Sequence, residues 1–216
     1  MEQKEKLQSA YIQHVLLHGE EPKTVYVFAK ENDTEEEEFY KHFGSFEGIE
    51  QAVWRDLMTT VISEVKAQAI WPEYSAREKV LSLFYSFFEM LKRKRSYAIF
   101  SLKKAPKSMG SPKVLNGLKK EEFERFTAEV LQEGIESGEL LDRPFFSKRY
   151  KDALWVQFGF VLSFWKQDTS ADFEKTDEAI EKGLNVTFDL FQRSPIDGIL
   201  EYGKFLAKNS GIKMPF

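Results

Sequence analysis

The chain has 216 residues and no cysteine, which excludes disulfides, thiolate metal sites and cysteine nucleophiles. A chain of this length can bury roughly 70% of its unfolded surface without covalent or metal staples, so one main core with a small appended unit is expected. The richest apolar run, residues 153–165, is interrupted by Gln157 and Ser163 and falls short of the roughly 20 residues that span a bilayer. The charged N-terminus also lacks the apolar stretch of a secretory signal, and we predict a cytoplasmic protein.

The formal net charge of −4 is distributed unevenly along the chain. Residues 1–50 contain twelve acidic and five basic side chains, a net charge of −7. The remaining 166 residues contain 23 acidic and 26 basic side chains, a net charge of +3. A segment that binds nucleic acid is normally basic, so the N-terminal fifty residues have the opposite charge to the usual one.

The N-terminal third of the chain reads as helices separated by capping residues. Apolar residues at helical spacing predict a first helix near 3–18, which Gly19 ends. A second helix is expected over 24–31 with Thr24 as its N-cap. Thr34 and Glu37 have the spacing of a capping box and predict a third helix that ends at Gly44. Ser45 is placed to cap a fourth, longer helix, which Pro72 closes.

The rest of the chain continues the helical pattern. Strand-like alternation and hairpin dipeptides are scarce. Two prolines, a glycine and two serines make residues 105–112 the expected flexible connection inside the larger domain. Apolar periodicity predicts helices near 75–94, 97–104, 112–137, 147–167, 172–192 and 195–209. We therefore predict an all-α fold.

Residues 24–54 resemble the N-terminal helix-turn-helix of the TetR family of bacterial transcriptional regulators. Thr24, Phe28 and Ala29 are similar to the family's second helix, Tyr40 and Phe43 to the aromatic pair of its third, and Ser45 with Glu47 to the cap that follows. Weaker resemblances lie at 133–140, a turn before the last core helices, and at 164–184, the closing helix pair.

The resemblance implies a homodimeric regulator. It implies a helix-turn-helix head over residues 1–46 that binds a DNA operator. Residues 47–216 then form a C-terminal core that holds a small apolar ligand and pairs through the helices near 147–167 and 172–192. The DNA contacts expected from it are Lys23, Thr24, Tyr40, Lys41 and His42. The expected dimer interface contains Trp155, Phe158, Leu162, Ile180, Leu184 and Phe188, and the expected ligand pocket contains Phe84, Phe87, Phe88 and Trp165.

The run Glu35–Glu38 leaves two functions open. The family usually has a small residue and a threonine where this chain has Glu37 and Glu38, and often a basic residue where it has Phe46. Acids are favoured at the positive N-terminal end of a helix, by about 0.3–1 kcal/mol each, which is a purely structural explanation for them. Alternatively, the chain is a protein-interaction or ligand-sensing module that has lost DNA binding, with a head directed toward a basic protein surface.

Other chemistry-bearing residues point to no further site. His14 and His18 are four residues apart on one helical face, a spacing that could bind a metal, but no carboxylate lies near them at ligand spacing. Cations are favoured at a helix C-terminus, which explains the basic run Lys92–Arg95. No nucleophile elbow, phosphate loop or metal-binding motif is found, so we predict no enzyme, no cofactor and no metal.

Overall fold

The computed structural model describes residues 3–103, 120–143 and 147–192, together with residues 198, 202, 203, 205 and 206. Within these ranges the chain forms helices and no strand, and the predicted all-α class is confirmed. None of the described helices combines the length and apolar character needed to cross a bilayer. The helices are α1 Gln3–His18, α2 Val25–Glu31, α3 Glu36–His42, α4 Phe46–Lys66, α5 Ala76–Arg93, α6 Arg95–Lys103, α7 Lys120–Glu136, α8 Tyr150–Gln167 and α9 Glu174–Phe191.

Capping residues fix most of the N-terminal boundaries as the sequence predicts. The hydroxyl of Thr24 accepts a hydrogen bond from the amide of Val27 at 3.1 Å. The hydroxyl of Ser45 accepts one from the amide of Gly48 at 3.1 Å. Gly19 follows α1 with a positive φ of 74°, a conformation that favours glycine.

The capping box predicted at Thr34 and Glu37 is wrong. The N-cap of α3 is Glu35, whose side chain makes no capping hydrogen bond. The amide of Thr34 instead donates to the carbonyl of Ala29 at 3.0 Å, so Thr34 completes the turn that ends α2. A capping box requires the threonine to sit directly before the helix, and here α3 begins one residue too late.

The ends of the later helices agree with the predicted ones to within three residues wherever the structure describes them. Short 3-10 turns lie between described helices at Trp71–Glu73, Ser147–Arg149 and Ala171–Phe173. Of the helix predicted at 112–137, the structure describes α7 from Lys120 onward, and residues 112–119 lie outside the described residues. Helix α6 begins at Arg95, two residues earlier than predicted, so the basic run is divided between the end of α5 and the start of α6. The predicted connection at 105–112 and most of the predicted helix at 195–209 lie outside the described residues.

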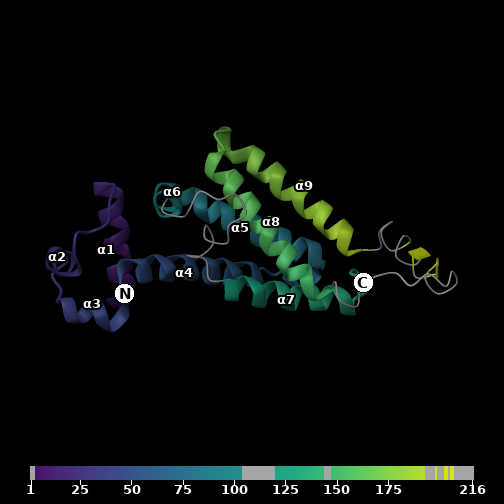
Figure 1. Cartoon of the computed structure of the whole chain (residues 1–216), viewed down its shortest axis with the longest axis horizontal. Helices are drawn as coiled ribbons and strands as arrows, with labels where there is room; N and C mark the ends of the chain where they lie inside the picture. Colours follow the sequence, from purple (N-terminus) through teal and green to yellow (C-terminus); the bar gives the residue numbers. More distant parts are fainter. Residues whose placement is uncertain are drawn as a thin grey trace.

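Helix α4 connects the N-terminal helices to the rest of the chain. In Figure 1, α1, α2 and α3 lie at one end of α4, and α5, α7, α8 and α9 gather around and beyond its other end. Ile49 and Val53, in its N-terminal half, and Leu57 and Val61, in its C-terminal half, are all buried. One helix therefore contributes to the packing of both parts.

A cluster of aromatic rings forms the core of the N-terminal helices. The Phe28 ring meets those of Phe39 and Phe46 edge to face, with centroids 6.0 and 5.4 Å apart. The Phe39 and Phe46 rings are 5.5 Å apart, and Phe46 stacks on Tyr11 of α1 at 5.5 Å. Offset and edge-to-face ring pairs are favourable beyond the apolar area that they bury, and these pairs hold α1, α2 and α3 against the start of α4.

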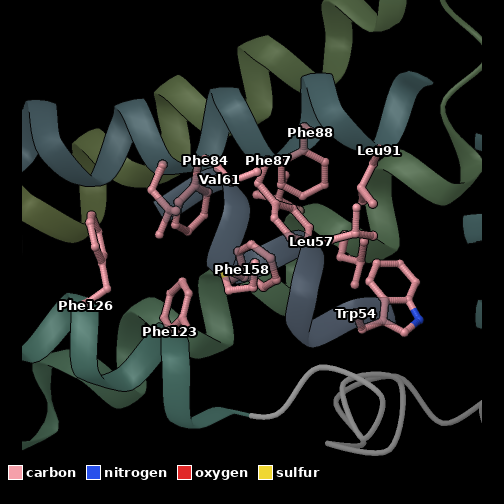
Figure 2. Packing of buried hydrophobic residues seen from close by; sticks show 14 of the residues in the cluster. Trp54, Leu57, Val61, Phe84, Phe87, Phe88, Leu91, Phe123, Phe126 and Phe158 are labelled. Carbon is pink, nitrogen blue, oxygen red and sulfur yellow. The ribbon is translucent and has the colours of Figure 1, made fainter. Parts of the chain in front are cut away.

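A second aromatic cluster surrounds Phe158 of α8. Its ring centroid lies 5.3 Å from that of Phe84, 5.1 Å from Phe87 and 5.1 Å from Phe123. Figure 2 shows these rings from α5, α7 and α8 facing Leu57 and Val61 of α4. Phe158 is fully buried, so α8 packs at the centre of the C-terminal helices.

Gly134 marks a place where α7 and α5 approach too closely for a side chain. A Cβ atom at this position would lie 2.8 Å from the Cβ of Ala76 and 2.8 Å from Cδ1 of Leu140. We expect Gly134→Ala to lower the free energy of unfolding by about 1–3 kcal/mol through overpacking, measured by chemical denaturation.

Gly48→Ala is the matched control, because a Cβ there meets only Ser45 Oγ, at 3.7 Å. Alanine is favoured over glycine by about 1 kcal/mol within a helix, so this variant should be as stable as the natural chain or more stable. Equal stability of the Gly134→Ala variant and the natural chain would contradict the close approach.

Candidate nucleic-acid interface, core and outer face

Helices α2 and α3 have the arrangement of a helix-turn-helix, with α3 along the lower edge of the N-terminal unit in Figure 1. The inner side of α3 is fixed by Phe39, which is fully buried. Four of the predicted contacts, Lys23, Tyr40, Lys41 and His42, lie on the exposed surface. Thr24 is also exposed, and its hydroxyl is used as the cap of α2.

Three of the four glutamates at the start of α3 pair with bases of the same unit. Lys30 Nζ lies 2.7 Å from Glu35, and Lys41 Nζ lies 3.0 Å from Glu38 and 3.6 Å from Glu37. The hydrogen bond to Glu38 raises the pKa of the Lys41 ammonium, and the same bond lowers the pKa of the Glu38 carboxyl. His42 Nε2 also lies 3.3 Å from Glu38.

These pairs determine which glutamates of this surface remain without a base beside them. Glu35 and Glu38 are matched by bases of their own surface, whereas the Glu37 side chain remains 85% exposed and has only the 3.6 Å contact. Exposed ion pairs are worth about 0–1 kcal/mol, so a phosphate can displace a glutamate from Lys41 at little cost. The uncompensated charge of this face therefore rests mainly on Glu36 and Glu37.

The two histidines of α1 lie together on the surface of the N-terminal unit. The His14 and His18 ring centroids are 4.4 Å apart, and His14 Nδ1 is 3.6 Å from Glu31 of α2. A search of the described ranges finds no group of three or more His, Cys, Asp or Glu side chains that could hold a metal ion.

The six predicted dimer residues are not on a free surface. All six are buried within this single chain, with exposed fractions between 0% for Phe158 and 8% for Trp155. Helices α8 and α9 have apolar side chains on two faces, and the periodicity of the sequence identified the inner one. The outer face carries Val156, Phe160 and Phe164 from α8 and Val186 and Leu190 from α9, with exposed fractions of 70%, 62%, 36%, 62% and 49%.

The four predicted pocket residues lie in one buried cluster. Phe87 and Phe88 have ring centroids 5.9 Å apart, and Phe88 and Trp165 have centroids 6.3 Å apart. The Trp165 side chain is fully buried, and its indole Nε1 has no hydrogen-bond partner in the described part of the chain. A buried donor left without an acceptor costs about 1–3 kcal/mol, so an acceptor brought by a ligand would be favoured here.

A hollow of about 440 Å³ opens away from this cluster, between the turn at Trp71–Glu73, the start of α5 and the end of α7. Three of the charged side chains that line it have partners. Glu139 accepts from the amides of Ala76 and Arg77 at 2.6 and 3.1 Å, and Lys79 Nζ lies 2.5 Å from Glu133. These contacts join α5 to α7, and we assign no ligand to the hollow.

A buried polar network joins α1, α4 and α6, and the sequence pattern did not identify it. Tyr11 donates to the carboxylate of Glu50 at 2.7 Å. Trp54 Nε1 donates to the hydroxyl of Ser101 at 3.0 Å, and Ser101 donates to Glu50 at 3.4 Å. Burial raises the pKa of Tyr11 well above its usual value. The one signal in the sequence was an acid, Glu50, beside Ile49 and Ala52 on the apolar face of α4.

A helix-turn-helix unit carried by a long helix that leads into a helical core defines a class of DNA-binding transcription regulators. Residues 79–206 match the family model of the tetracyclin repressor-like C-terminal domain. This match covers more than half of the chain, and the protein belongs to the TetR family. A comparison with curated proteins gives no match.

Solved structures show the same fold. A TetR family transcription regulator from Shewanella sp. PV-4 is 12% identical, with a TM-score of 0.60 over 90% of this chain and 100% of that one. The fatty acid degradation regulator FadR from Bacillus halodurans is 18% identical, with a TM-score of 0.61 over 85% and 97% of the two chains. The regulator FadR from Bacillus subtilis, in complex with stearoyl-CoA, is 18% identical, with a TM-score of 0.59 over 83% and 97%.

Proposed function

We propose that the protein is a homodimeric transcriptional regulator that binds a DNA operator through residues 1–46 and responds to an apolar ligand held in residues 47–216. The observation that carries this proposal is the membership of the TetR family, established over residues 79–206, together with a helix-turn-helix at α2 and α3. Family members are regulators and generally not enzymes, and the proposal involves no catalytic step.

The proposed DNA contacts are Lys23 and Thr24, directly before α2, and Tyr40, Lys41 and His42 on α3. Lys41 and His42 reach phosphates only when Glu38 releases them. Specific DNA-binding proteins commonly make roughly 6–10 phosphate contacts, more than this surface offers in one protomer. Two heads in a dimer double the number, so we propose weak binding with a shallow salt dependence.

The first test is DNA binding by fluorescence anisotropy at about 50 mM salt, with fragments from the protein's own genomic neighbourhood. The double variant Glu36→Gln, Glu37→Gln should bind the same fragment about tenfold more tightly, equivalent to about 1.4 kcal/mol, because it removes repulsion from phosphates and leaves the pairs of Glu35 and Glu38 intact. The control is Glu121→Gln with Glu136→Gln on α7, which removes the same charge from exposed positions in the core.

Failure of the folded protein to bind any fragment would instead favour the second candidate, a module of the same fold that binds a basic protein surface. The observation behind this candidate is that exposed Tyr26, Val27 and Tyr40 accompany the glutamates on the outer surface of α2 and α3. If this candidate is right, a protein with a basic surface should copurify with the chain, and replacement of Glu35–Glu38 by alanine should weaken its binding. In the DNA-binding case the same replacement leaves DNA affinity equal or stronger.

The proposed dimer forms through the outer face of α8 and α9, defined by Val156, Phe160, Phe164, Val186 and Leu190. The spacing of four residues aligns the exposed apolar side chains of each helix in a stripe along that helix, and α8 packs against α9. A contiguous exposed apolar patch of this kind marks an interaction surface, and two copies of one patch make a self-complementary twofold contact.

Phe160→Glu should dissociate this dimer, raising the dimer dissociation constant at least about a hundredfold because it places two unpaired charges in the contact. Analytical ultracentrifugation measures the change. Leu17→Glu is the control, since Leu17 is 72% exposed on α1, outside the proposed contact. A dimer of Phe160→Glu with unchanged affinity, or a monomeric natural protein, would refute this interface.

The proposed ligand is apolar and enters between Phe84, Phe87, Phe88 and Trp165. Support comes from the aromatic lining, from the unpartnered Nε1 of Trp165, and from the stearoyl-CoA held by FadR from Bacillus subtilis. Because these side chains pack against one another without a ligand, the proposed pocket opens by displacing them.

Stearoyl-CoA, stearate and coenzyme A alone are the probes for this pocket, added to the protein during thermal unfolding. A ligand present at 100 times its dissociation constant stabilises the native state by about 2.7 kcal/mol, so the two acyl compounds should raise the melting temperature and coenzyme A should leave it unchanged. Tryptophan fluorescence should change in parallel. Identical melting curves for all three probes would count against an apolar ligand.

A further inference from the structure

Helices α8 and α9 lie antiparallel, and two contacts show which of their residues face each other. The Tyr150 ring at the start of α8 stacks on the Phe191 ring at the end of α9, with centroids 4.0 Å apart. Further along α8, the side chain of Gln157 lies against Gly183 of α9. The two helices run side by side from the top of the molecule in Figure 1.

Gln157 lies at the middle of the outer face of α8 and α9. This face runs from Phe164 on α8 to Leu190 on α9. Leu190 directly precedes Phe191, which stacks on Tyr150, so the Leu190 end of the face lies beside Tyr150. Gln157 comes seven residues after Tyr150 and seven before Phe164, and its side chain is partly exposed. A polar side chain therefore stands at the centre of an apolar surface.

The backbone of α9 makes room for this side chain at Gly183. A Cβ atom on Gly183 would overlap Nε2 of Gln157 and would lie 2.8 Å from its Cδ, so the amide lies directly over α9. Gly183 is the tenth of the eighteen residues of α9, and glycine destabilises the interior of a helix relative to alanine. The amide that it accommodates explains why a glycine stands in this position.

The amide of Gln157 makes no hydrogen bond within the described part of the chain, unlike two polar neighbours. The hydroxyl of Ser163 donates to the carbonyl of Gly159 at 2.9 Å, and that of Thr187 donates to the carbonyl of Gly183 at 2.8 Å. A primary amide has two donor positions and an acceptor oxygen. Because burial of an unpaired amide is costly, whatever covers the outer face has to supply both a donor and an acceptor.

We infer that the Gln157 amides of two protomers hydrogen-bond to each other at the twofold axis of the dimer and fix its register. This inference rests on the proposed dimer through the outer face. A twofold contact maps its surface onto itself, so the centre of that surface lies on the axis and a side chain there meets its own copy. Two amides related in this way satisfy each other, because Nε2 of each donates to Oε1 of the other.

The amide pair discriminates between partners by what happens when it is broken. A shift of one protomer along the other separates the two amides and leaves both buried without partners. A related chain with an apolar residue at this position leaves one of them unpaired. A single polar residue in an apolar helix contact is known to specify register and partner in this way. Gln157 thus favours the symmetric homodimer over its alternatives.

Mixing two forms of the chain tests the pair. The isotopically labelled natural protein is mixed in equal amounts with unlabelled Gln157→Leu, and native mass spectrometry measures the three dimers after the subunits have exchanged. Both homodimers bury matched side chains, whereas the mixed dimer leaves one amide without a partner. We expect the mixed dimer to be at least about tenfold less abundant than random pairing would give. Val156→Leu, an apolar exchange at the neighbouring position, is the matched control and should mix at random.

Gln157→Cys is the second variant and tests whether this position meets its own copy. The chain contains no cysteine, so a disulfide-linked dimer of this variant can only join position 157 of two protomers. A disulfide requires Cα atoms within about 7 Å of each other. We expect mild oxidation to cross-link Gln157→Cys rapidly and to leave Leu17→Cys, exposed on α1 outside the contact, uncross-linked.

The outcomes separate the amide pair from the dimer itself. Random mixing of Gln157→Leu with the natural chain would overturn the pair, and so would a dimeric Gln157→Cys that fails to cross-link. If Phe160→Glu still dissociates the dimer in either case, the proposed interface stands without the pair. A monomeric natural protein would refute both.

Discussion

Helix α4 has to satisfy two cores at once, and the rest of the molecule is arranged around that constraint. Its N-terminal turns close the aromatic cluster of Phe28, Phe39 and Phe46, and Leu57 and Val61 pack into the cluster around Phe158. Because an α-helix is stiff over its 21 residues, a tilt of α4 in one core displaces the other. Among the described contacts, the hydrogen bonds of Ser101 on α6 with Trp54 and Glu50 hold α4 in its position.

The net charge of residues 1–50 does not show which of their bases are free to bind phosphate. The count of −7 over residues 1–50 treats all glutamates alike, but Glu35 and Glu38 are matched by Lys30, Lys41 and His42 within hydrogen-bonding or ion-pair distance. The same pairs occupy the bases that DNA would need. Pairing leaves the net charge of −7 unchanged, because the count already includes both lysines, but it makes Lys30, Lys41 and His42 less available to phosphates.

Helix positions could be predicted from the sequence because they depend on local signals. Thr24, Ser45 and Gly19 act on backbone groups within four residues, and their roles were confirmed. Thr34 is not a cap because α3 begins at Glu36, with Glu35 in the N-cap position, and Thr34 belongs to the preceding turn. Tertiary partners have no such local signal. The sequence showed that Arg95 is basic but not that it lies over the rings of Trp165 and Phe173, 70 and more residues further along the chain. The predicted DNA, dimer and pocket contacts remain predictions.

The two apolar faces of α8 differ in what restrains them. Phe158 and Leu162 are fully buried in the chain's own core, so a substitution there changes the folding stability of each protomer. Val156 and Phe160 lie largely outside that core, and their identity is free to change without repacking it. Related chains that share this fold can therefore diverge in what they pair with through one side of a single helix, while the opposite side preserves the interior.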